Sequence, residues 1–148
     1  MNNSSGFTLI EVLIAMLVLA AGLLGLAGLQ ATSLGNNQGA YNRSQATQYA
    51  NDLADRIRAN AGAVGSYIAD PTTAAAKPGC QSTTGCSPAD MAENDLYEWN
   101  LALIAALPVN AVNIGQIAGI ITISISWDEN HDGVVDGDDP DFLTSFRL

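Results

Sequence analysis

An apolar run from Phe7 to Leu29 constrains this chain more than any other feature. It contains 23 residues, and Glu11 is its one charged side chain. A helix needs about 20 apolar residues to cross a bilayer, so the run predicts a membrane-capable helix. An ionised carboxylate in that setting costs about 2.5–3.5 kcal/mol on insertion scales, which indicates that Glu11 is kept for a function.

The remainder of the chain is acidic. Its formal net charge is −10, and seven of the fifteen carboxylates lie between Asp128 and Asp141. Five Lys or Arg residues are present, and the first of them is Arg43. Nucleic-acid phosphates are bound by clustered cations, so we expect no nucleic-acid partner. A length of 148 residues leaves room for one modest domain beside the membrane helix.

The segment before the apolar run predicts a cleavage site. An ordinary secretory signal has an apolar core of about 7–15 residues, followed by a small-x-small site. This run is longer and no such site ends it, whereas a cut after Gly6 would release the polar leader "MNNSSG". The mature chain would then begin "FTLIEVLIAM", with Glu11 as its fifth residue.

The stretch "GFTLIEVLIA" resembles the class III signal of type IV pilins and of the pseudopilins of type II secretion. The resemblance implies that a prepilin peptidase cuts after Gly6 and methylates the amine of Phe7. It also implies that Glu11 pairs with the N-terminal ammonium of a neighbouring subunit, and a low-dielectric setting strengthens such a pair. The alternative is that Glu11, close to the helix end, extends to the membrane interface.

We expect four segments: a leader at residues 1–6, a transmembrane or filament-core helix at residues 7–29, an amphipathic continuation at residues 30–60 and a small head at residues 61–148. Apolar side chains at intervals of three and four predict the buried face of the continuation: Ala46, Tyr49, Ala50, Leu53 and Ile57. A second helix should begin at the N-cap Ser87 and end at Pro108. Its buried face comprises Leu96, Trp99, Leu103 and Leu107.

Three segments after Pro108 predict strands. The stretch "GIITISISWD" alternates apolar and polar residues, which is the period of a half-buried strand. The alternation in "FLTSFRL" suits an antiparallel partner, and residues 109–116 would add an edge. We therefore expect an α+β fold in which the long N-terminal helix packs on a small antiparallel sheet, as in type IV pilins.

Two cysteines, Cys80 and Cys86, lie in the loop rich in Gly, Ser, Thr, Pro and Ala at residues 66–88. Zinc sites use more ligands at tighter spacings, and a redox pair more often reads C-x2-C. On a membrane-anchored chain the pair favours a small disulfide in an oxidising compartment. The alternative is two free thiols on a reduced loop.

The acidic stretch "DENHDGVVDGDDPD" resembles a calcium loop of the EF-hand type. The predicted ligands are the side chains of Asp128, Asn130, Asp132, Asp136 and Asp139, with the backbone carbonyl of Val134. The last ligand is Asp rather than Glu and the flanks are strands, so a solvated hairpin loop is the alternative. We expect His131 to be a solvated side chain.

No nucleophile–base pair or phosphate loop is visible, so we expect no enzyme. The stretches "GLLGLAGLQ", "RSQATQYANDLADRIRAN", "DLYEWNLALIAALP" and "ITISISWD" resemble minor pilins of the PilV type. That resemblance implies a role in priming type IV pilus assembly, at or near the tip. It implies an inner-membrane anchor with a periplasmic head before assembly, and a place in the surface pilus afterwards.

The expected partners are other minor and major pilins, the prepilin peptidase, the assembly machinery of the inner membrane and a tip adhesin. One alternative is a minor pseudopilin of a type II secretion system, which uses the same signal. Another is a membrane-anchored module that binds a ligand or adheres in a calcium-dependent way.

Overall fold

The computed structural model describes residues 8–107 and 109–148. They form two compact units, which divide between Gly39 and Ala40. The long helix α1, Leu9–Ala59, contributes its first part to one unit and its last part to the other. The N–H of Glu11 donates to the carbonyl and the hydroxyl of Thr8, at 3.1 and 3.4 Å, so Thr8 caps the start of α1.

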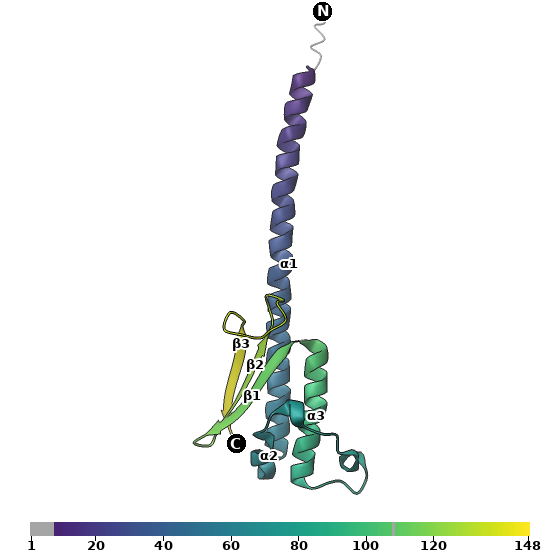
Figure 1. The fold of residues 1–148 in the computed structure, drawn as a ribbon, viewed down its shortest axis with the longest axis vertical. Coiled ribbons are helices and arrows are strands. Elements are labelled where there is room, and N and C mark those ends of the chain that lie inside the picture. Colours follow the sequence, from purple (N-terminus) through teal and green to yellow (C-terminus); the bar gives the residue numbers. More distant parts are fainter. Residues whose placement is uncertain (1–7, 108) are drawn as a thin grey trace, which may run out of the picture. The chain divides into compact units, whose positions relative to one another are not determined.

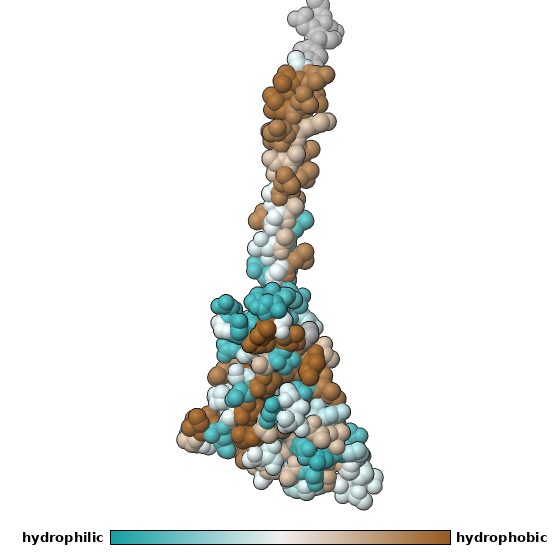
Figure 2. Space-filling view, in the orientation of Figure 1, coloured by the Kyte–Doolittle hydropathy of each residue, from teal (hydrophilic) through white to brown (hydrophobic). Residues whose placement is uncertain are grey.

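The first unit consists of α1 as far as Gly39 in the residues that the structure describes. Every side chain from Thr8 to Gln38 is exposed, and apolar residues cover its first half in Figure 2. Within the described range, α1 is the helix whose length and hydropathy suffice to cross a membrane. The structure therefore contains the apolar N-terminal helix that the sequence predicts.

The second unit begins with the last part of α1. The predicted face is buried at Ala46, Ala50, Leu53 and Ile57, whereas Tyr49 is half-buried and packs against the core. After α1 the chain forms a 3₁₀ turn, Ala61–Ala63, and the short helix α2, Val64–Tyr67. The predicted loop at residues 66–88 is less irregular than expected, because it contains two further 3₁₀ turns, η2 (Pro71–Thr73) and η3 (Pro78–Gln81). Proline occupies the first position of η2 and η3, where its fixed φ favours a helical turn.

The helix α3, Pro88–Ala106, follows the predicted pattern. The Ser87 hydroxyl accepts the N–H of Asp90 at 3.1 Å and so caps the helix. The predicted residues Leu96, Trp99, Leu103 and Leu107 are all buried. The predicted stop at Pro108 lies outside the described residues, and the helix ends at Ala106.

Among the described residues, three antiparallel strands form a sheet in the order β1-β2-β3 (Figure 1). The strands are β1, Asn110–Ile117; β2, Ile120–Trp127; and β3, Asp141–Arg147. The alternating residues Ile121, Ile123, Ile125 and Trp127 of β2 are buried, as the period predicts. They form one core cluster with the buried faces of α1 and α3. The α+β fold with a long helix packed on an antiparallel sheet is confirmed.

Candidate functional site

The first candidate site is the start of α1. Glu11 is exposed, and no side chain in residues 8–107 or 109–148 forms an ion pair with its carboxylate. Its neighbours along the helix are apolar: Val12, Ala15, Met16 and Leu19. The predicted processing residues Gly6 and Phe7 lie outside the described residues. A partner for Glu11 must therefore come from those residues or from another molecule.

The second candidate site is the acidic loop at residues 128–140, between β2 and β3. The Asp128 carboxylate accepts three backbone N–H groups, from His131 at 2.6 Å, Asp132 at 3.2 Å and Gly133 at 2.9 Å. Positive φ at His131 and Gly133 lets the chain curl around that carboxylate. The loop thus has an ordered backbone built on its first predicted ligand.

The other predicted ligands also accept backbone N–H groups. Asn130 accepts from Asp132, Asp132 accepts from Val134, and Asp136 accepts from Asp138, at 2.9 to 3.0 Å. Asp139 accepts from Glu129 and Asp136, and these bonds, led by that from Glu129, hold the pKa of the Asp139 carboxyl below its usual value. Each carboxylate keeps further lone pairs, since its oxygens offer about four acceptor sites in all.

Within the described part of the chain, no group of three or more His, Cys, Asp or Glu side chains is arranged to hold a metal ion. The predicted ligands lie in one loop, but their side-chain oxygens accept hydrogen bonds from backbone N–H groups of that loop. His131 is exposed, in agreement with a solvated side chain. Calcium binding stays a prediction.

Calcium should protect the acidic loop from the serine protease Glu-C, because the ion would offset repulsion among carboxylates. We expect cleavage at this loop to be several-fold slower in calcium than in a calcium chelator. Asp139→Asn should abolish this difference in cleavage rate between calcium and chelator. Asp141→Asn, a matched change in β3, should preserve it. Equal cleavage rates in calcium and chelator would refute the calcium prediction.

The sequence did not mark Glu129 as a functional residue, yet it fastens the acidic loop to the last part of α1. Its Oε2 accepts the indole N–H of Trp127 at 2.6 Å and the amide of Asn42 on α1 at 3.2 Å. Asn42 is buried, so its amide needs such a partner. One signal was available: Glu129 continues the alternation that buries Ile125 and Trp127.

The sequence also gave no sign of a hydrogen-bond network that joins three helices. The Tyr67 hydroxyl donates to Asp95 at 2.5 Å, and the same carboxylate group accepts from Arg56 at 3.2 Å. Burial of Tyr67 and its bond to Asp95 raise the pKa of the phenol, so it stays neutral. This network connects α1, α2 and α3 and has a structural role.

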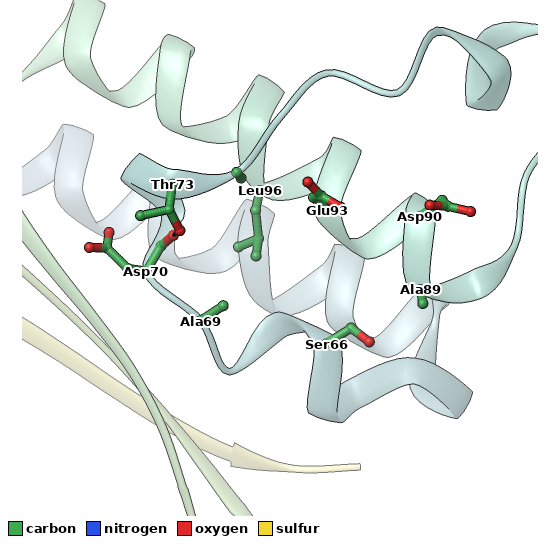
Figure 3. A pocket seen from close by; sticks show the side chains of 9 residues that line it. Ser66, Ala69, Asp70, Thr73, Ala89, Asp90, Glu93 and Leu96 are labelled. Atoms are coloured by element: carbon green, nitrogen blue, oxygen red, sulfur yellow. Dashed lines mark hydrogen bonds between the residues drawn. The ribbon is translucent and has the colours of Figure 1, made fainter.

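Cys80 and Cys86 form a disulfide, in agreement with the sequence. A hollow of about 310 Å³ lies between α3 and residues 66–74. Asp90, Glu93 and Leu96 of α3 line one wall, and Asp70 and Thr73 line the other (Figure 3). The carboxylates that line the hollow have partners nearby: Asp70 accepts a hydrogen bond from Thr72, Asp90 accepts one from Ser87, and Glu93 forms an ion pair with Lys77 at 2.8 Å.

Replacing both cysteines by serine should lower the free energy of unfolding by about 2 kcal/mol, because the short closed loop no longer restricts the unfolded chain. Denaturation of the full chain in detergent micelles, with the wild type under non-reducing conditions, measures the change. Gln81→Ala is the control for loss of the Gln81–Glu98 hydrogen bond in the same loop. A loss within about 0.5 kcal/mol, the range of an ordinary surface substitution, would contradict this prediction.

Comparison with known families places these features in context. Residues 1–27 match the family described as Prokaryotic N-terminal methylation motif, and residues 28–97 match the family described as Type IV pilin Tt1218. The two matches adjoin and together cover residues 1–97, so this part of the chain is similar to an N-terminal methylation motif followed by a type IV pilin family. No curated protein and no solved structure matches it.

The pilin match covers α1 from Gly28, the disulfide loop and α3 as far as Tyr97. The sheet and the acidic loop follow the matched residues. Similarity to a pilin family together with this motif favours a structural, pilin-like role in a pilus or a pseudopilus. It implies general interaction with pilins, with the peptidase and with the assembly machinery, and a membrane anchor before the protein enters the filament.

Proposed function

We propose that this chain is a minor pilin that primes type IV pilus assembly at or near the tip. The observation that carries the proposal is the match to the methylation motif followed by the match to a pilin family along one helix, α1. Near the described start of this helix, Glu11 has no ion-pair partner among residues 8–107 and 109–148. In the first part of α1, residues 9–38, every apolar side chain is exposed, so this part requires lipid or other helices around it. A filament core of neighbouring pilin helices supplies that environment.

The proposed sequence of events starts in the inner membrane, where the chain is a single-pass protein with a periplasmic head. The disulfide supports an oxidising compartment for the head. The prepilin peptidase cuts after Gly6 and methylates Phe7. The assembly machinery then passes the subunit into the filament, where Glu11 pairs with the amine of a neighbouring minor or major pilin.

At the tip, the head would contact other minor pilins and a tip adhesin. The four stretches that resemble PilV-type pilins support the minor role, and two of them, in α3 and β2, belong to the head.

Deleting the gene in the native host tests this function. We expect fewer pili, restored by the wild-type gene, and expect immunogold labelling of the chain at pilus tips. Unchanged pilus numbers together with loss of type II secretion would assign the chain to a pseudopilus instead. Label spread along the whole pilus would contradict the tip position.

A further inference from the structure

Glu129 joins three parts of the second unit. Its Oε2 accepts the amide of Asn42 on α1 at 3.2 Å and the indole N–H of Trp127, at the end of β2, at 2.6 Å. Its own N–H donates to Oδ1 of Asp139, on the far side of the acidic loop, at 2.9 Å. We call these contacts the Glu129 clamp. They connect α1 to the central strand of the described sheet and to the acidic loop that follows it (Figure 1).

The clamp has a firm base on the sheet. The N–H of Trp127 donates to the carbonyl of Pro140, directly before β3, at 3.4 Å. The N–H of Asp128 donates to the carbonyl of Val109, directly before β1, at 3.1 Å. Backbone bonds on both sides of β2 therefore hold the residues that precede Glu129. The Glu129 side chain is half-buried, and a lower local dielectric strengthens hydrogen bonds to a charged acceptor.

The clamp lies at the end of the α1 interface where apolar packing is weakest. Asn42 is the first buried residue of α1. The next fully buried side chains are Ala46 and Ala50, whereas Leu53 and Ile57 follow further along the helix. An alanine removes less apolar surface from water than a leucine or an isoleucine, so it contributes less to holding the helix in place. Separation of α1 from the head should therefore begin at Asn42 unless a polar contact prevents it.

We infer that the Glu129 clamp locks α1 against the head at Asn42, and that this end of the interface opens first when the clamp is released. The acidic loop thereby has a mechanical role, because its Asp139 holds the backbone of Glu129 in place. The use of such a lock rests on the proposed function. A pilin leaves the membrane with its apolar helix, and a pull on that helix reaches the buried interface first at Asn42.

Thiol labelling of the full chain in detergent micelles, with its disulfide intact, tests the inference. The variants Ala46→Cys, Ala50→Cys and Ala54→Cys, made one at a time, place a reporter thiol at three buried positions, each further from Asn42. A thiol reagent reaches such a group only when the interface opens. Loss of a hydrogen bond to a charged acceptor shifts an opening equilibrium by about tenfold or more. We expect Glu129→Ala to accelerate labelling of Ala46→Cys by that factor, with a smaller increase at Ala50→Cys and the smallest at Ala54→Cys.

Three further variants control the experiment. Glu129→Gln keeps an oxygen at the same place, so it should accelerate labelling of Ala46→Cys less than Glu129→Ala does. Asn42→Ala removes the α1 side of the clamp and should give the same order of increases along the helix. Glu98→Ala removes a carboxylate that accepts two hydrogen bonds elsewhere on the head, and it should leave labelling of Ala46→Cys unchanged.

Two results would overturn the inference. Equal increases at all three reporters would show a loss of overall stability rather than opening from one end, and no increase at Ala46→Cys would show that the clamp does not hold the helix. The labelling uses the purified chain, so its result does not depend on pili. An unprocessed chain in cells that contain the peptidase would refute the proposed function and would leave the labelling result intact.

Discussion

Replacing Glu11 with leucine is expected to leave cleavage after Gly6 intact and to keep the chain out of pili. No side chain in the described residues neutralises this carboxylate, and its helical neighbours are apolar. If the amine of a neighbouring subunit is its partner, the leucine variant leaves that ammonium unpaired in a low-dielectric core. Breaking such a pair costs about 3–5 kcal/mol, which corresponds to about 100-fold or more in incorporation.

The measurement is the amount of chain in sheared pili relative to the membrane fraction, by quantitative immunoblot. Glu11→Asp keeps the charge on a shorter side chain and should retain part of the incorporation. Val12→Ala alters the neighbouring apolar position and should have little effect. If the leucine variant enters pili as the wild type does, Glu11 only extends to the membrane interface and has no docking role.

The largest expected effect on stability comes from Trp99→Ala. Trp99 of α3 is 1% exposed and lies in the core cluster that α3 forms with α1 and the sheet. Truncating a buried tryptophan removes its burial energy and leaves a cavity, at a cost of about 3–5 kcal/mol. We expect the second unit to lose that much free energy of unfolding, measured by urea titration of the full chain in detergent micelles. The fluorescence of Trp127 reports the transition.

Trp99→Phe separates packing from hydrogen bonding. The Trp99 indole N–H donates to the carbonyl of Tyr49 at 2.8 Å, and phenylalanine removes this bond while it keeps an aromatic ring. The bond itself should contribute about 1 kcal/mol. A loss below about 1.5 kcal/mol for Trp99→Ala would show that the site collapses around the gap, contrary to the close packing inferred here.

The elements of this fold were predictable where one local pattern decides the outcome. Ile121 to Trp127 alternate because one face of β2 is buried, and Leu96, Trp99 and Leu103 recur at helical spacing for the same reason in α3. Ser87 followed by Pro88 marks a helix start through backbone chemistry alone. The short turns after α1 were missed, because they depend on burial of Tyr67 and Pro71 by residues distant in the sequence.

The contacts that fasten the candidate sites were predictable to a smaller degree. Glu129 and Asn42 are 87 residues apart, and no local pattern encodes their pairing. Likewise Asp95 looks like an ordinary helix carboxylate until the fold brings Tyr67 and Arg56 to it. The motif around Gly6, Phe7 and Glu11 is different, because a processing enzyme reads it as a linear segment. Its function can therefore be predicted without the fold.

The mature N-terminus tests the account most directly. The full chain is expressed with and without a prepilin peptidase and analysed by mass spectrometry. The account predicts a chain that begins at Phe7 with a methyl group on its amine, and that appears solely when the peptidase is present. An intact Met1 in the presence of the peptidase, or a cut after Leu29, would contradict the pilin function and remove the proposed role of Glu11.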